Sequence, residues 1–130
     1  MALDETHRRL IVACREPSAL VVFDTRSGKQ VTQVAVDPGL FSDDIFFDPA
    51  KSRIYVVART AVGTDERTPG PGMLEVFQQK DSDHYDKLGT QPTGFGAQTG
   101  FFSPALGKLF VATRRQQGGA GGEILVYDTK

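Results

Sequence analysis

LDETHRRLIVACR (residues 3–15), FDPAKSRIYVVAR (residues 47–59) and FSPALGKLFVATR (residues 102–114) are three versions of one pattern. Each stretch contains a turn-forming segment, then a basic residue, then an apolar run that is followed by an arginine. Short apolar runs that are rich in β-branched and aromatic residues and bounded by Asp, Pro, Ser and Gly predict β-strands joined by turns. The sequence therefore indicates one strand unit that is used three times.

A second apolar element follows each of these stretches along the chain. Its three copies, ALVVFDTRSGK (residues 19–29), MLEVFQQKDSD (73–83) and EILVYDTK (123–130), each carry an aromatic residue at the same place. None of the apolar segments has the periodic stripe of a helix, so we expect almost no helix. A strand-rich repeat of roughly 40–50 residues is typical of β-propeller blades, each of which is a four-stranded antiparallel sheet.

We therefore predict an all-β fold, a β-propeller fragment of about three four-stranded antiparallel blades that form an incomplete ring. The chain is expected to be a single segment, with blade 1 at about residues 1–37, blade 2 at about 43–92 and blade 3 at about 96–130. Blade 3 is expected to lack its outer strand. The alternative fold is a β-sandwich whose segments are similar by coincidence.

Several segments resemble bacterial YVTN-type β-propeller repeat proteins, in particular their C-terminal blades: DDIFFDPAKSRIYVVA (residues 43–58), VFQQKDSDHY (76–85) and EILVYDTK (123–130). Residues 2–29 are similar to the middle blades of the same family. The resemblance implies a structural repeat, a complete ring in full-length members and, often, export to the periplasm or the cell exterior. The sequence departs from the family in residues 60–72, which are longer than the usual connection, and it lacks the upstream blades, so we expect a fragment of a longer propeller or an assembly.

Composition and charge exclude several classes of function. The chain has 15 basic and 16 acidic residues and a net charge of −1, so there is no basic field to hold a nucleic-acid backbone. The apolar runs are too short for a membrane-spanning helix, and the first ten residues lack the pattern of an export signal, which leaves the location unknown. No nucleotide-binding, phosphate-loop or serine-hydrolase motif is found, and we expect no catalytic residue, metal or cofactor.

The arginine that ends each repeat is the candidate functional feature. In a propeller, the second strand of each blade ends on the face that carries the loops between blades, and Arg15, Arg59 and Arg114 take this position. An arc of guanidinium groups would suit a carboxylate, sulfate or phosphate through forked hydrogen bonds. The alternative is that each arginine pairs with an acidic residue of the neighbouring blade, for instance Asp43 or Asp44, and only holds the blades together. The polar residues expected on the same face are Asp43, Asp44, Gln98 and Thr99.

Other polar groups favour structural interpretations. Asp43 and Asp44 are not expected to share a metal ion, because adjacent residues of a strand point to opposite sides. We expect His7 and His84 in solvated turns on the opposite face. Cys14, the single cysteine, lies in the apolar run LIVAC and is interpreted as a buried core thiol.

Two connections on the arginine face are expected to be mobile loops that could line a binding surface. They are residues 64–72 and the glycine-rich segment 118–122.

The sequence leaves three functions open. The first is a non-enzymatic scaffold or binding module whose partner is an unknown protein, a glycan or a small anionic ligand. The second is a fragment of a propeller enzyme of the lactonase or lyase type, with its catalytic groups in missing blades. The third is a structural protein of the cell envelope. Because the end blades would expose apolar faces, we also expect pairing with missing blades or self-association, for example of two copies that complete a ring.

Overall fold

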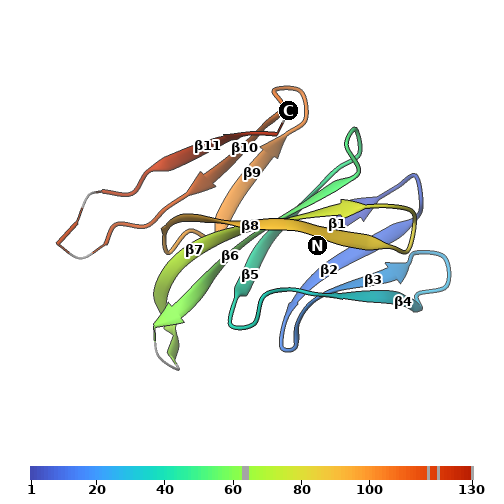
Figure 1. Ribbon diagram of the computed structural model, residues 1–130, viewed down its shortest axis with the longest axis horizontal. Coiled ribbons are helices and arrows are strands. Elements are labelled where there is room, and N and C mark those ends of the chain that lie inside the picture. The colour runs from blue at the N-terminus through green and yellow to red at the C-terminus, as the bar shows by residue number, and fades with distance from the viewer. Residues whose placement is uncertain (63–64, 117, 120, 130) are drawn as a thin grey trace.

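The computed structural model describes residues 1–62, 65–116, 118–119 and 121–129, which form eleven strands in three antiparallel sheets and no helix (Figure 1). The predicted all-β class is therefore confirmed. Within the described part of the chain, no helix has the length and apolar character needed to cross a membrane.

Each sheet uses one continuous part of the chain, and its strands lie side by side in chain order. Sheet 1 contains β1 (Ala2–Asp4), β2 (Arg9–Arg15), β3 (Ser18–Asp24) and β4 (Gln30–Ala35). Sheet 2 contains β5 (Phe41–Asp48), β6 (Arg53–Val62), β7 (Asp65–Gln79) and β8 (Tyr85–Phe95). Sheet 3 contains β9 (Thr99–Ser103), β10 (Lys108–Ala112) and β11 (Ile124–Asp128).

The repeated positions of the sequence occupy the same register in all three sheets. The residue that opens the apolar run of the second strand pairs with the aromatic residue of the third strand; the pairs are Leu10 with Phe23, Ile54 with Phe77, and Leu109 with Tyr127. On its other side, the same residue pairs with an apolar residue of the first strand; these residues are Leu3, Phe47 and Phe102. The three sheets are thus built on one pairing scheme, which is the scheme that the sequence pattern repeats.

Two apolar cores lie between neighbouring sheets. The core between sheets 1 and 2 includes the fully buried Ile11, Leu20, Ile54 and Phe77. The core between sheets 2 and 3 is formed by a second set of side chains: Tyr55, Val57, Leu74, Ala97, Phe102, Leu109 and Val111. Because successive strand residues point to opposite faces, sheet 2 contributes one face to each core. This explains why the run of residues 54–58 in β6 is apolar and buried at every position.

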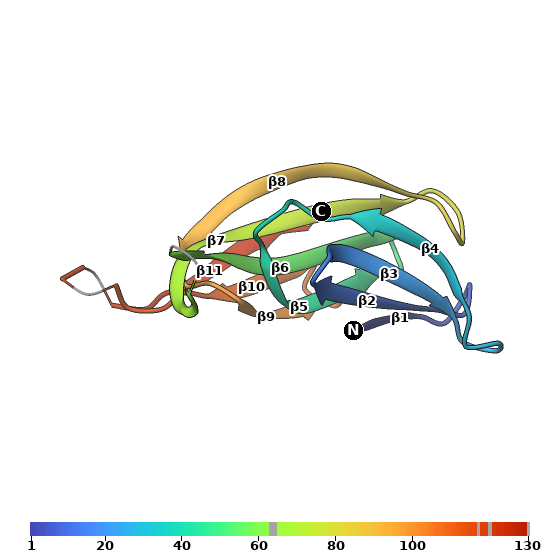
Figure 2. The same cartoon turned by 90° about the horizontal axis from the view of Figure 1, so that it is seen from below.

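The sheets are arranged so that their first strands are close to one another. β1 and β2 lie against β5, and β9 lies against β5 and β6. In Figure 2, β1, β5 and β9 lie along the lower side of the view, whereas β4 and β8 lie along the upper side. The sheets therefore stack face to face, with the first strand of each sheet on one side of the stack and the fourth strands of sheets 1 and 2 on the other (Figure 2).

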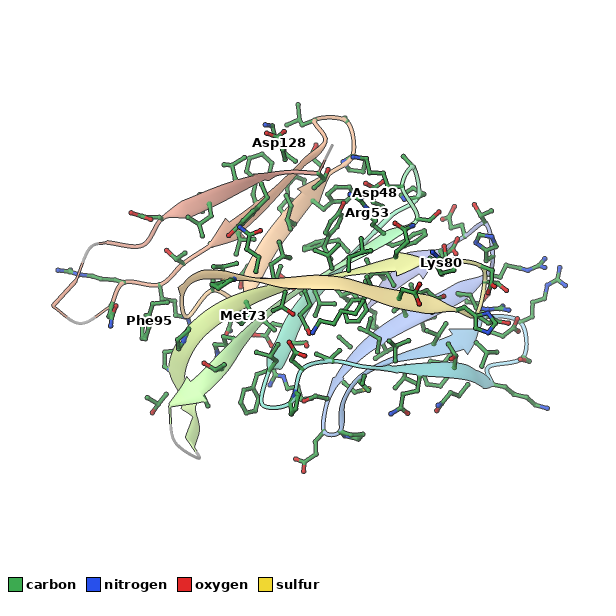
Figure 3. The ribbon with its side chains drawn as sticks, viewed as in Figure 1. Asp48, Arg53, Met73, Lys80, Phe95 and Asp128 are labelled. Carbon is green, nitrogen blue, oxygen red and sulfur yellow. The ribbon has the colours of Figure 1, made fainter. Side chains whose placement is uncertain are left out.

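The connections between strands gather at two ends of the molecule. We call the end with the connections β2–β3, β4–β5, β8–β9 and β10–β11, where β6 also ends and β7 begins, the loop end, and the end with the other connections the turn end. Figure 3 shows Met73 and Phe95 toward the loop end, and Asp48, Arg53 and Asp128 toward the turn end. All three second strands run from the turn end to the loop end, so the repeated arginines are carried to the loop end.

Two of the sequence-based expectations are wrong. Residues 65–72 are not a loop: they belong to β7, which continues its pairing with β6 out to Val62 and Asp65. Register shifts in this extension accommodate prolines that would interrupt a regular ladder. Residue 64, which begins the expected loop, lies outside the described residues. Cys14 is only half-buried, because it lies on the face of sheet 1 that points away from sheet 2.

Asp4 joins sheets 1 and 2 at the turn end. Its buried carboxylate accepts hydrogen bonds from Gln79 Nε2 of β7 at 2.7 Å and from the His7 backbone N–H at 3.1 Å. Burial raises the pKa of the Asp4 carboxyl, but these hydrogen bonds outweigh burial and hold the pKa below its ordinary value. The charged form of Asp4 is therefore the one that stabilises the contact between the two sheets.

Replacing Asp4 with asparagine is expected to lower the free energy of unfolding by about 1–2 kcal/mol near neutral pH, because a buried charged acceptor is lost. A carboxyl whose folded-state pKa is depressed stabilises the protein above its unfolded pKa of about 4 and loses this effect as the pH falls through the lower folded pKa. The gap between wild type and Asp4→Asn should therefore narrow between about pH 5 and about pH 2 in urea titrations. A gap that is constant over this range would show that the charge of Asp4 does not matter.

Candidate functional site

The repeated arginines leave the second strands at the loop end. Arg15 is the last residue of β2, Arg59 lies in β6 opposite Gly72 of β7, and Arg114 follows β10. The strand register places the three at equivalent positions, five residues after Leu10, Ile54 and Leu109. What each guanidinium group does depends on the sheet that follows it.

Arg15 connects sheet 1 to sheet 2. Its Nε donates a hydrogen bond to the backbone oxygen of Ser42 at 3.3 Å, and its terminal nitrogen forms an ion pair with Asp43. The Arg15 side chain is still 49% exposed, so a solvent molecule or a ligand can reach the guanidinium group. The contact ties the two sheets together without closing off the cation.

Arg59 makes the corresponding connection between sheets 2 and 3. Its Nε donates to Oε1 of Gln98, which takes the repeat position that Asp43 has in sheet 2, four residues before Phe102 and Phe47, respectively. The guanidinium group also lies over the ring of Phe41, 5.7 Å from the ring centre, a cation–π contact. Two of the three arginines therefore bind the polar residue at the same position of the next sheet, which is the structural role that the sequence left open.

Asp44 faces the opposite direction from Asp43. Its carboxylate accepts a hydrogen bond from the backbone N–H of Gly100 in sheet 3 at 2.8 Å, whereas Asp43 pairs with Arg15 in sheet 1. The two adjacent carboxylates thus join sheet 2 to both of its neighbours. Their separation on the two faces of the strand is what the alternation of β-strand side chains predicts.

Arg114 lies apart from the hollow beside Arg15. Its backbone N–H donates to the oxygen of Phe95 at 2.9 Å, and its exposed side chain lines a hollow of about 240 Å³ between the end of β8 and the β10–β11 connection. Thr99, the remaining polar residue expected here, is exposed at the start of β9. The structure therefore divides the expected arc into two sheet-to-sheet contacts and one exposed arginine.

A hollow of about 600 Å³ lies at the loop end of sheet 1, beside Arg15. Its lining comes from the β2–β3 turn, the β4–β5 connection and the start of β5: Arg15, Glu16, Pro17, Ser18, Ala35, Val36, Pro38, Gly39, Leu40 and Phe41. Most of these side chains are apolar, and Arg15 is the single cation among them. Apolar walls with a few charged groups are the usual character of small-molecule sites, and the volume falls within their usual range.

A buried ionic cluster, which the sequence analysis did not identify, joins sheets 1 and 2 near their outer strands. Glu75 of β7 is fully buried and pairs with Lys87 Nζ at 2.5 Å; it also accepts a hydrogen bond from the Asp37 backbone N–H at 3.1 Å. Lys87 Nζ is 2.6 Å from the Asp37 carboxylate as well. A signal was present in the sequence, because Glu75 takes the repeat position that is Val21 in sheet 1 and Leu125 in sheet 3.

The charges of this cluster stabilise one another. The hydrogen bond from Lys87 is the main cause that holds the pKa of Asp37 below its ordinary value. Partial burial would lower the pKa of Lys87, but the hydrogen bonds to Asp37 and Glu75 outweigh it and raise that pKa. A cation held in this way between two carboxylates has a structural role and is a poor donor for a ligand.

The histidines lie in exposed turns at the turn end, as expected. His7 Nδ1 is 2.7 Å from the Asp4 carboxylate, and His84 Nδ1 is 2.8 Å from the Asp81 carboxylate. The described glycines of the segment 118–122 lie outside the strands; residues 117 and 120 are outside the described part of the chain.

No model of a known protein family matches this chain, and no curated protein is similar to it in sequence.

Proposed function

We propose that this chain is a non-enzymatic binding scaffold of the β-propeller class, in which the three sheets are successive blades and the loop end receives the ligand. Three properties support the propeller assignment: continuous use of the chain by each sheet, one pairing register in all three sheets, and first strands that lie against one another. Radial repetition of antiparallel sheets with these properties defines the propeller architecture.

The observation that carries the ligand proposal is the hollow of about 600 Å³, in which the half-exposed Arg15 is the single cation of a mainly apolar lining that also contains Glu16. Asp43 and Ser42 fix the guanidinium group from one side, so a ligand does not have to order the long side chain before binding. An arginine held in this way recognises planar anions through paired hydrogen bonds. The ligand class that fits is a small molecule or peptide end with an apolar body and a carboxylate or phosphate group.

The proposal is tested by following backbone amide signals in NMR spectra while benzoate, inorganic phosphate or sulfate is added. We expect benzoate to shift the amides of Ser18, Gly39 and Phe41, because its ring fits the apolar wall and its carboxylate fits the cation. Arg15→Ala should weaken binding by at least about 10-fold, since a charged hydrogen bond is worth about 1.5–3 kcal/mol. Arg15→Lys should recover only part of the affinity, because an ammonium group lacks the forked geometry.

The matched control is Arg26→Ala, which removes an exposed arginine from the turn end and should leave the titration unchanged. Two results would contradict the proposal: no shift at the loop end with any of the three anions, or equal affinities of wild type and Arg15→Ala.

A further inference from the structure

Sheet 3 has a second apolar face that no described residue covers. The side chains of Phe101, Ile124 and Val126 on this face are 63%, 62% and 54% exposed. Phe110, half-buried, packs against Phe101 with ring centres 6.3 Å apart, and together they border a shallow hollow of about 180 Å³. We call Phe101, Phe110, Ile124 and Val126 the sheet 3 outer face. Large apolar side chains gathered on one surface are uncommon unless a partner covers them.

Sheet 1 has an apolar face of the same kind at the other end of the stack. Ala2, Ile11 and Val22 point toward sheet 2, so the residues that alternate with them point outward. We call Leu3, Leu10, Val12 and Phe23 the sheet 1 outer face; Leu3 is 50% exposed and the other three are half-buried.

The two outer faces are the counterparts of two faces that already bind each other inside the chain. Phe101, Phe110 and Val126 of sheet 3 form one cross-strand row. The same row in sheet 2 is Phe46, Tyr55 and Val76, which belongs to the core with sheet 3. The residues of the sheet 3 outer face therefore occupy the positions that, in sheet 2, pack against the following sheet.

The sheet 1 outer face has the complementary register. Its cross-strand row is Leu3, Leu10 and Phe23. The same row receives the preceding sheet twice within the chain, as Phe47, Ile54 and Phe77 in sheet 2 and as Phe102, Leu109 and Tyr127 in sheet 3. Each interface inside the chain thus joins a face equivalent to the sheet 3 outer face with a face equivalent to the sheet 1 outer face.

We propose that a second copy of this chain binds head to tail, with the sheet 3 outer face of one copy on the sheet 1 outer face of the other. The occupant is a second copy because the two faces continue the interface that joins sheets 1, 2 and 3, and both kinds of face are present on every copy. Such a contact joins different surfaces of the two copies. The dimer is closed when the sheet 3 outer face of each copy lies on the sheet 1 outer face of the other, which gives two contacts. The inference rests on strand register and exposure, and it is independent of the ligand proposed for the loop end.

The test measures the mass of the 130-residue chain by light scattering and sedimentation over a range of concentrations. We expect a dimer at about 100 µM, a concentration that saturates a micromolar contact. Phe101→Glu and Leu3→Glu each place a charge on one outer face, and each should weaken association at least about 30-fold, as expected for a central interface residue. Ile124→Glu and Leu10→Glu are second variants of the same two faces, and circular dichroism checks that each variant keeps its strands.

Mixing the two single variants gives the most specific result. Phe101→Glu has an intact sheet 1 outer face and Leu3→Glu has an intact sheet 3 outer face, so the mixture can form one contact without a substitution, whereas each variant alone carries a charge in every contact. At about 3 µM, where a micromolar contact weakened about 30-fold leaves each variant alone mainly monomeric, the equimolar mixture should associate more strongly than either variant alone. Leu88→Glu changes an exposed leucine of β8, which is 54% exposed and lies on neither outer face, and should associate like wild type. A wild-type monomer at about 100 µM, or a mixture that associates no more strongly than either variant alone, would overturn the head-to-tail contact.

Discussion

Replacing Phe77 with alanine is expected to lower the free energy of unfolding by about 3–5 kcal/mol, the cost of emptying a fully buried aromatic position. Phe77 is completely buried in the core between sheets 1 and 2 and pairs with Ile54 in the centre of its sheet. Neighbouring strands hold the backbone in place on both sides, so the cavity cannot collapse easily. Urea unfolding with linear extrapolation provides the measurement.

The chain contains a matched control for this prediction. Phe23 is also a phenylalanine at the same repeat position, and it pairs with Leu10, the equivalent of Ile54. Phe23 lies on the sheet 1 outer face, however, and is only half-buried. Phe23→Ala should therefore cost less, about 1–2 kcal/mol, when it is measured at a concentration at which the chain is monomeric. Equal costs for the two substitutions would contradict the inference that packing between neighbouring sheets, and not pairing within one sheet, buries this position.

The repeat could be predicted from the sequence because each sheet pairs strands that follow one another in the chain. The same pairing and the same side-chain alternation therefore produce a similar pattern of apolar residues in each of the three stretches. Leu10, Ile54 and Leu109 begin three similar apolar runs, and the structure pairs them with Phe23, Phe77 and Tyr127. Turn-forming residues set the ends of most strands. The prediction from turn-forming residues was wrong for residues 65–72. Their prolines and glycines indicated a loop, but β7 remains paired with β6 there.

The sequence suggested Asp43 or Asp44 as a partner for an arginine of the neighbouring sheet, but it could not decide whether the arginines make such contacts, because this depends on how each sheet stacks on the next. The sequence was compatible with free guanidinium groups that bind an anion and with guanidinium groups that join the sheets. Asp43 and Gln98 take the same position in successive sheets, and the structure brings each of them to the arginine of the preceding sheet. Pattern alone places Arg15 and Arg59 at the loop end; only the stacking determines what they contact.

For Glu75, the repeat pattern indicated the burial of the residue but not the partner that neutralises its charge. The alternation in MLEVF places Glu75 on the same face as Phe77, so a buried carboxylate could have been expected from the apolar residues at the equivalent positions. The cation that neutralises it comes from β8, where Lys87 lies opposite Phe77. The repeat pattern does not include the fourth strand, β8, so it gave no direction for the Lys87 side chain. For this reason the pair of Glu75 and Lys87 could not be predicted.

Replacing Lys87 with methionine is expected to lower the free energy of unfolding by about 3 kcal/mol, because Glu75 would remain buried without its cation. The loss should lie at the lower end of the range for buried pairs, since the Lys87 side chain is 28% exposed and water can partly replace it. Lys80→Met is the matched control: Lys80 pairs with Asp86 at 3.7 Å on the surface, and removing such a pair should change stability very little.

A double-mutant cycle separates the charge of Glu75 from the packing of Lys87. Glu75→Gln keeps the shape of the side chain and removes its charge, so Lys87→Met should cost much less in the Glu75→Gln background than in wild type. The difference between the two costs measures the interaction between the buried carboxylate and its cation, and we expect it to be at least about 1.5 kcal/mol. If Lys87→Met costs the same in both backgrounds, the lysine acts through its aliphatic stem, and the ionic cluster does not hold sheet 1 against sheet 2.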